Sequence, residues 1–349
     1  MMRPVNYRSF PAGPLFAAVL LARLLTPAAF GAGQTVTLAF AENPGRVAVD
    51  DRHIYLLDGH AVTILDRKDF SVLKRFGRRG EGPGEFTAHP NDPPGFALGK
   101  QGLVISAQNR VLVFSRAGEC LNQVNSGVRG IACQPLGKLL VGIERPRMDK
   151  RLAVSYQLYD NRIEQRARLY HYEDDFQSGE GLQILKNPYE YHYSFAADDE
   201  HAYIYRKDKQ AIGVFDSRGE QLRAIALGGD GGEVSRETAE RIIKFWKEDS
   251  VKKQYFPFLK PVTVAPRFPA LRQLRLSNGI LYVITYKRRG GLNQCRMFRT
   301  SGESLGECMI PLREKDPMEF YPLAIHDGML FQLMENDEDE WVLKVHEIR

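Results

Sequence analysis

Apolar residues in this chain recur in short runs, and polar or glycine-rich turns separate these runs. Six segments share one arrangement, in which an apolar strand, a turn and a second apolar strand follow one another. Short runs of apolar and β-branched residues between turn residues predict β-hairpins. The dipeptides Asn278-Gly279 and Asp327-Gly328 are the strongest hairpin signals, because tight hairpin turns need positive φ angles. The six segments are residues 47–57, 96–106, 131–141, 195–205, 274–284 and 323–333.

A second hairpin follows the first in several of these units. Three copies carry a glycine, which is Gly118, Gly219 or Gly302, where a type I turn with a bulge needs a residue at positive φ. In a fourth copy, at residues 64–70, Asp69 replaces this glycine and tolerates that conformation less well. The third unit lacks the glycine, which leaves the boundary of that unit open.

Two hairpins per unit form a four-stranded meander, and six such units predict an all-β, six-bladed β-propeller. The last unit has room for only three strands, and the third of these is residues 341–348. An unassigned apolar strand at residues 35–40 can complete it. We therefore expect the N-terminal strand to close the ring without a covalent link and to leave no large free edge.

A glycine-rich loop at residues 76–86 joins the first unit to the second. Its four glycines permit positive φ and Pro83 fixes one φ, so the loop has a defined shape. Phe76 and Phe86 are expected to anchor its two ends. A weaker copy occurs at residues 227–233.

Residues 77–86, together with the repeated hairpins, resemble bacterial exported six-bladed β-propellers related to NHL-repeat proteins. Residues 281–287 and 335–337 add to this resemblance, which covers residues 34–349. It implies the six-bladed fold. The wider NHL class contains both binding platforms and enzymes, so the resemblance implies a fold more safely than an activity.

An insertion at residues 233–270 interrupts the repeats. Ala239, Ile242, Ile243 and Trp246 lie at helical spacing, and Ser235 is a suitable N-cap. The sequence therefore predicts a helix near residues 235–250. This helix either covers one end of the propeller or acts as a mobile lid.

The N-terminal residues 1–33 have the pattern of an export signal. Arg3 and Arg8 precede an apolar stretch at residues 15–30, which Arg23 interrupts. The alternative is an uncleaved amphipathic N-terminus. With export, the propeller at residues 34–349 is periplasmic or extracellular and has no stable membrane span once the signal is removed.

The charge balance gives little support for nucleic-acid binding. The formal net charge is +5, and removal of the three arginines in residues 1–33 leaves +2. Arg145, Arg147, Lys150 and Arg151 form a basic loop without interleaved aromatic residues. We therefore expect no nucleic-acid partner.

The four cysteines, Cys120, Cys133, Cys295 and Cys308, have spacings that fit neither a zinc cluster nor a CxxC redox site. Cys295 and Cys308 flank one predicted hairpin. A two-residue turn would place them opposite each other, whereas a three-residue loop with a glycine bulge would put them on opposite faces. The sister repeats favour the second register, and we expect both thiols to be reduced, although an exported protein is compatible with disulfides.

No sequence motif indicates catalysis, a metal or a cofactor. The eight histidines are scattered, and the sequence has no Gly-x-Ser-x-Gly elbow, P-loop or dinucleotide fingerprint in a suitable context. The expected blade entries include Arg46, Arg129, Phe195 and Gln273, which suit a cation poorly.

The candidate binding residues precede or begin successive inner strands, where they would line one mouth of the channel. They are Arg129, His192, Arg272 and Tyr321. Tyr191 and Tyr193 flank His192, and the three rings either form a stacking surface for a sugar or peptide or belong to a half-buried strand end.

Arg78 and Arg79 in the glycine-rich loop either bind an acidic partner or pair locally, for example with Glu85. Taken together, the sequence predicts an exported, monomeric, non-catalytic propeller that binds a protein, peptide or glycan at this mouth without a cofactor. The alternative is a metal-assisted hydrolase or lyase with its active site in the channel.

Overall fold

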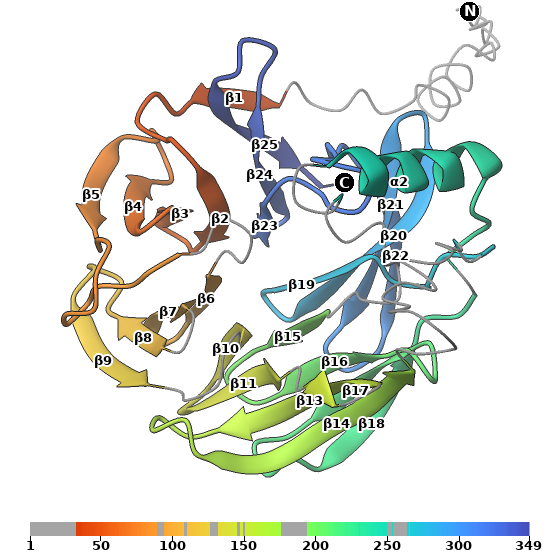
Figure 1. The fold of residues 1–349 in the computed structure, drawn as a ribbon, viewed down its shortest axis with the longest axis horizontal. Helices are drawn as coiled ribbons and strands as arrows, with labels where there is room; N and C mark the ends of the chain where they lie inside the picture. The colour runs from red at the N-terminus through yellow and green to blue at the C-terminus, as the bar shows by residue number, and fades with distance from the viewer. Residues whose placement is uncertain are drawn as a thin grey trace, which may run out of the picture.

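The chain forms a ring of six antiparallel β-sheets (Figure 1). The computed structural model describes residues 33–88, 94–107, 110–125, 132–144, 147–148, 151–175, 194–229, 231–249, 253, 264 and 266–348. Each sheet is one blade of a six-bladed β-propeller, as the sequence predicts. Five sheets have four strands, and the third has a short fifth strand.

Each blade is a meander whose first strand lies nearest the axis of the ring (Figure 1). Blade 1 comprises β2 (Pro44–Val49), β3 (His53–Asp58), β4 (Ala61–Asp66) and β5 (Val72–Phe76). Blade 2 comprises β6 (Gly95–Gly99), β7 (Gly102–Ala107), β8 (Arg110–Phe114) and β9 (Cys120–Asn125). Blade 3 comprises β10 (Ala132–Leu136), β11 (Leu139–Glu144), β13 (Arg151–Tyr159) and β14 (Gln165–Asp175), with β12 (Arg147–Met148) beside β13.

The second half of the ring repeats this order. Blade 4 comprises β15 (Phe195–Ala197), β16 (Ala202–Arg206), β17 (Ala211–Phe215) and β18 (Gln221–Ala226). Blade 5 comprises β19 (Gln273–Ser277), β20 (Ile280–Arg289), β21 (Leu292–Arg299) and β22 (Ser304–Ile310). Blade 6 comprises β23 (Leu323–His326), β24 (Met329–Glu335), β25 (Trp341–Glu347) and, from the other end of the chain, β1 (Gln34–Thr37). The six predicted hairpins are thus the two innermost strands of the six blades.

The ring is closed by pairing between its first and last strands. Val36 of β1 lies opposite Leu343 of β25 in an antiparallel register. Leu38, just after β1, is 2% exposed and packs in a cluster that also contains Leu56 of blade 1 and Phe331 of blade 6. The predicted non-covalent closure is confirmed.

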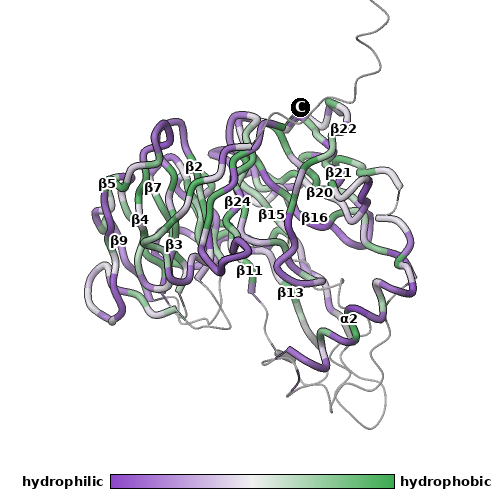
Figure 2. Tube along the Cα trace, turned by 90° about the horizontal axis from the view of Figure 1, so that it is seen from above, coloured by the Kyte–Doolittle hydropathy of each residue, from purple (hydrophilic) through white to green (hydrophobic). Residues whose placement is uncertain are grey.

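The hydrophobic core lies between the blades. Within the described residues, six buried clusters each join two neighbouring blades. The apolar colouring in Figure 2 accordingly follows the strands, while many turns are hydrophilic. This layered packing is typical of propellers, in which each blade buries its two faces against its neighbours.

The bulged hairpin turns confirm the predicted positive φ at Gly118, Gly219 and Gly302. The third unit, whose boundary the sequence left open, has the same turn, with Ile163 at a φ of 62°. In blade 1 the expectation for Asp69 is wrong, because Phe70 takes the positive φ, also 62°. The reason is a longer loop: the Asp66 N–H bonds to the Ser71 carbonyl, and this loop has one more residue than its sister loops.

The predicted register of Cys295 and Cys308 is also wrong. The expected three-residue loop is present, since the Arg299 N–H donates to the Glu303 carbonyl. A register shift between Met297 and Phe298 then moves the pairing by one residue and places the two cysteines directly opposite each other. Both are buried, and the four cysteines of the chain are free thiols.

The predicted helix is α2 (Arg236–Glu248), and the Ser235 hydroxyl accepts the Thr238 N–H at its N-terminus. Ile242 is fully buried in a cluster with Tyr286 of blade 5 and Met318. The helix therefore packs against blade 5, in front of it in Figure 1 and beyond the strand ends in Figure 2. Among the helices that the structure describes, none has the length and apolar character needed to cross a bilayer.

A buried carboxylate fixes the first turn of blade 1. Asp50 is 6% exposed and accepts the backbone N–H groups of Arg52 and His53, the Tyr55 hydroxyl at 2.9 Å and Arg116 Nη1 at 2.8 Å. Burial alone would raise the pKa of Asp50, but these four donors outweigh it and hold the pKa below the ordinary value of 3.8. Asp198 of blade 4 makes the equivalent bonds to His201 and Tyr203.

This pKa shift predicts a loss of stability in acid. Because the folded pKa lies below the unfolded one, the stabilisation from the Asp50 carboxylate is complete above about pH 4 and is lost as the pH falls through the folded value. We expect Asp50→Asn to lower the free energy of unfolding by about 2 kcal/mol at pH 7, and by progressively less below pH 4. Urea denaturation between pH 7 and pH 3 measures this, with Asp337→Asn, at a side chain that is 96% exposed, as the control. A pH-independent difference would contradict the prediction.

Candidate functional site

The candidate site lies at the end of the ring where the six inner strands begin, which we call the entry face. Because neighbouring strands are antiparallel, the turns of each blade alternate between this face and the opposite one. Arg272 immediately precedes β19 and Tyr321 lies two residues before β23, so both are at the entry face as expected. Arg129, Tyr191, His192 and Tyr193 lie outside the described residues.

Arg272 is an almost completely buried cation, with a side chain that is only 4% exposed. Its Nη1 donates to Glu314 Oε1 at 2.7 Å. Its guanidinium lies 3.7 Å from the centre of the Phe320 ring and 5.2 Å from that of Tyr286, in cation–π geometry. Within the described part of the chain, Nε and Nη2 have no hydrogen-bond partner. Arg272 thus retains unused donors in an environment where each one is costly.

Glu314, in the loop between β22 and β23, gathers two further arginines. Arg241 of α2 and Arg288 of β20 each approach its Oε2 to 3.4 Å. The side chains of Arg241 and Arg288 are 51% and 39% exposed, whereas that of Glu314 is 15% exposed. We call these four residues the Glu314 cluster. Three guanidiniums share one carboxylate, so the cluster carries a net positive charge that its own members do not balance.

Tyr321 places an amphipathic ring beside this cluster, next in the chain to Phe320. Its hydroxyl donates to Glu335 Oε2 at 3.2 Å, and its ring meets Trp341 edge-on at 6.0 Å. Partial burial, together with the Glu335 carboxylate, raises the pKa of Tyr321. The tyrosine is therefore neutral at physiological pH. Its one O–H is donated to Glu335, so its hydroxyl oxygen can accept a hydrogen bond while its ring offers apolar area.

Arg78 and Arg79 lie in the glycine-rich loop between blades 1 and 2, away from the Glu314 cluster. This loop folds around Glu85, which accepts the Gly82 N–H at 2.8 Å and Arg78 Nε at 2.5 Å. These two bonds hold the pKa of Glu85 below its usual value. Phe86 is fully buried, and Phe76 packs on Phe114, so the two phenylalanines anchor the loop as predicted.

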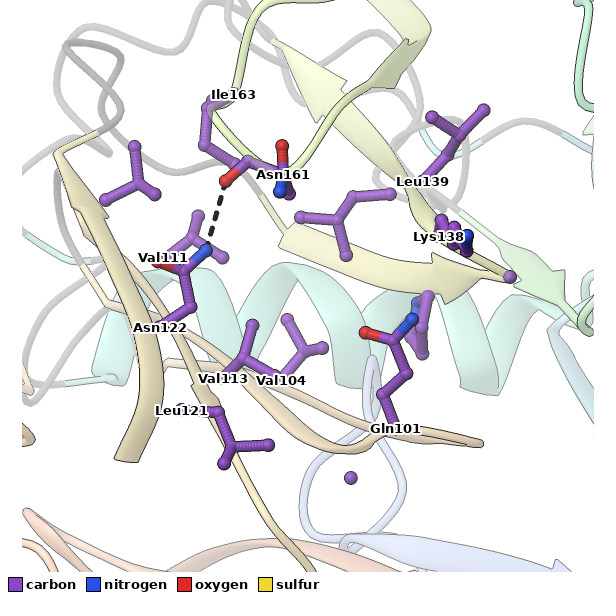
Figure 3. Close-up of a pocket in the computed structure, with 15 residues that line it drawn as sticks. Gln101, Val104, Val111, Val113, Leu121, Asn122, Lys138, Leu139, Asn161 and Ile163 are labelled. Atoms are coloured by element: carbon purple, nitrogen blue, oxygen red, sulfur yellow. Dashed lines mark hydrogen bonds between the residues drawn. The ribbon is translucent and has the colours of Figure 1, made fainter. Parts of the chain in front are cut away.

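A separate cavity of about 340 Å³ opens in the seam between blades 2 and 3 (Figure 3). Valine, leucine and isoleucine side chains line part of it, and Gln101, Asn122, Lys138 and Asn161 add polar groups. Asn122 Nδ2 donates to the Asn161 carbonyl at 3.1 Å across it. The turns that border it, after β6, β10 and β13, lie on the face opposite the entry face, so this cavity is distinct from the Glu314 cluster.

The described residues contain no group of three or more histidine, cysteine, aspartate or glutamate side chains that could hold a metal ion. Several of the described histidines lie next to a carboxylate: His326 Nε2, for example, lies 2.9 Å from Asp51 Oδ1 of blade 1. At the Glu314 cluster three arginines face one carboxylate, so this part of the entry face repels cations and attracts anions.

Comparisons with known proteins give information about the fold and about nothing else. No family model matches the chain, and no curated protein matches it. Among solved structures, a member of the DUF4221 family from Bacteroides vulgatus has a TM-score of 0.50 and 12% identity, covering 92% of this chain and 97% of that one. A candidate exported protein from Bacteroides fragilis has a TM-score of 0.49 and 11% identity, covering 91% and 95%. At such low identity the DUF4221 structure supports the propeller architecture and nothing about a ligand.

The sequence predicted that Arg272 and Tyr321 lie at the entry face, but it gave no indication of Glu314, Arg241 or Arg288 as neighbours of Arg272. Glu314 lies 42 residues from Arg272, in a loop without a recognisable pattern. Arg241 could have been noted as a basic residue on the helix next to the apolar face, and Arg288 as one of several basic residues at the end of an apolar strand. Neither signal indicates a shared partner.

Proposed function

We propose that this protein is an exported, non-catalytic propeller that binds a protein, peptide or glycan at the entry face. The observation that carries the proposal is the Glu314 cluster, in which three arginines from three elements converge on one carboxylate. A convergent set of arginines beside aromatic rings is typical of binding sites, because guanidinium groups and aromatic rings provide most of the energy in many interfaces.

The other parts of the proposal rest on the sequence. The charged and apolar pattern of residues 1–33 supports export to the periplasm or the cell exterior. The glycine-rich loop and the repeated hairpins support a relationship to NHL-repeat propellers, and we propose that the protein acts as a monomer. We also assign Arg129, Tyr191, His192 and Tyr193 to the same mouth, with Arg78 and Arg79 as an outlying part of the binding surface.

Array binding tests this function. The labelled protein is applied to an array of neutral and acidic oligosaccharides and peptides, and the probes that it binds are then titrated with variants. We expect the double variant Arg241→Gln/Arg288→Gln to bind at least about tenfold more weakly, because each lost charge-assisted contact is worth roughly 1 kcal/mol or more. These two side chains are partly exposed, so the fold should survive.

Arg218→Gln is the matched control, because Arg218 is an exposed arginine in a turn on the opposite face. It should bind like the wild type. Equal binding by the double variant would overturn the assignment of the site. One divalent ion per chain, lost together with a hydrolytic or lyase activity, would instead support the enzymatic alternative.

A further inference from the structure

Two arginines lie on inner strands of the ring. Each is the third residue of its strand, so both lie slightly deeper in the ring than the entry face. Arg275 belongs to β19, and its side chain donates from Nε to the Leu323 carbonyl of β23 at 3.3 Å and from Nη1 to the Leu274 carbonyl at 2.9 Å. Arg46 belongs to β2, and its Nη1 donates to the Gly45 carbonyl at 2.9 Å. Strand β23 lies between the two, since β2 and β19 both contact it.

The charge of Arg275 is not balanced by any acidic side chain in the described part of the chain. None of the ion pairs there includes it, and its two acceptors are neutral carbonyl groups. Burial and the nearby positive charge of Arg46 lower the pKa of Arg275 to about 10. Arg275 therefore keeps an unbalanced positive charge near a second arginine, and a bound anion would balance it.

Solvent reaches this part of the ring. Arg46 and Arg275 are only partly buried, unlike Leu274, which is 1% exposed. The same contrast holds in blade 2, where the inner strand β6 is partly exposed along its whole length and its neighbour β7 is buried throughout. A small group on a ligand can therefore approach the two guanidiniums from the axis of the ring.

We infer that Arg46 and Arg275 bind an oxyanion, either a carboxylate or a sulfate or phosphate, that the ligand of the entry face inserts towards the axis of the ring. This inference rests on the proposed function and names the chemistry of the ligand. The planar guanidinium fork matches such groups with two parallel hydrogen bonds, which an isolated chloride ion cannot form. The Glu314 cluster extends the same positive field to the rim of the mouth.

Thermal unfolding in three sodium salts tests the inference. The midpoint of the purified full chain is measured with acetate, sulfate or phosphate, while sodium chloride keeps the ionic strength constant. We expect at least one oxyanion to raise the midpoint in a saturable way, by about 2–3 °C at ten times its dissociation constant. A response to acetate alone identifies a carboxylate ligand, and a response to sulfate or phosphate identifies a tetrahedral oxyanion.

Variants separate specific binding from the general stabilisation that sulfate and phosphate give to all proteins, which rises without saturation. Arg275→Gln should abolish the saturable part and Arg218→Gln should retain it. If Arg275→Gln does not fold, Arg46→Gln takes its place. Saturable shifts that are equal in the wild type and in both channel variants, or none in the wild type, would overturn the inference. Array binding that still depends on Arg241 and Arg288 would then leave the proposed function standing.

Discussion

Replacing Glu314 with alanine is expected to lower the free energy of unfolding by about 3 kcal/mol, because removing one partner of a buried ion pair leaves an uncompensated charge. The carboxylate is the hydrogen-bond acceptor of the nearly buried Arg272 and the common partner of Arg241 and Arg288. Without it, three guanidiniums repel one another next to apolar rings. Urea denaturation of the wild type and the variant at pH 7 measures the loss.

Glu319→Ala provides the control within the same loop. Glu319 is exposed, and it supports its neighbours through its backbone carbonyl, which the substitution keeps. It should change the free energy of unfolding by less than about 0.5 kcal/mol. If Glu314→Ala were as stable as this control, the cluster would be an exposed network of little energetic value, and its assignment as the site would lose its physical basis.

Leu38→Ala is expected to have an effect of similar size at the closure of the ring. Leu38 is 2% exposed and packs between blades 1 and 6, where a Leu-to-Ala change in a core costs about 3 kcal/mol. Because β1 is held to the ring by its pairing with β25 and by this side chain, we expect the loss to appear first as local opening of the closure. Hydrogen exchange at the amides of β1 and β25, measured with urea denaturation, detects it.

Thr37→Ala is the matched substitution one position earlier, at an exposed side chain of β1. It should leave both the exchange rates and the free energy of unfolding nearly unchanged. Faster exchange spread evenly over all six blades of Leu38→Ala would contradict the prediction, since it would mean that the ring opens only by unfolding as a whole.

The hairpins could be predicted because their signals are local. Alternating apolar residues predict the strands, and dipeptides such as Asn278-Gly279 predict the turns, without reference to distant parts of the chain. The helix was predictable for the same reason, from Ser235 and the spacing around Ile242. Registers depend on single bulges. The shift after Met297 that aligns the two cysteines is the bulge that goes with the turn glycine, and it recurs after Val113 and Val214. The glycine predicts that bulge but not which residues it brings opposite each other. The positive φ at Phe70 or Ile163 leaves no mark in the pattern.

For the candidate site, the sequence could predict the position in the fold but not the contacts between its residues. The start of an inner strand identifies the entry face, so the sequence could place Arg272 and Tyr321 at that face. Their partners come from a helix, a long hairpin and a loop that meet only in the folded ring, and no spacing in the chain encodes that meeting. Two arginines of inner strands are visible in the sequence: Arg275 lies between Leu274 and Leu276, and Arg46 directly precedes the apolar run at residues 47–49.

The junction of β1 with β25 also has a consequence for biosynthesis. The ribosome makes β1 first and β25 last, so the sixth sheet can be completed only after almost the whole chain has emerged. Until then, the flank of blade 1 that Leu38 and Phe331 later cover stays open to other chains. We therefore expect nascent or truncated forms of this protein to need protection from aggregation at that flank above all others.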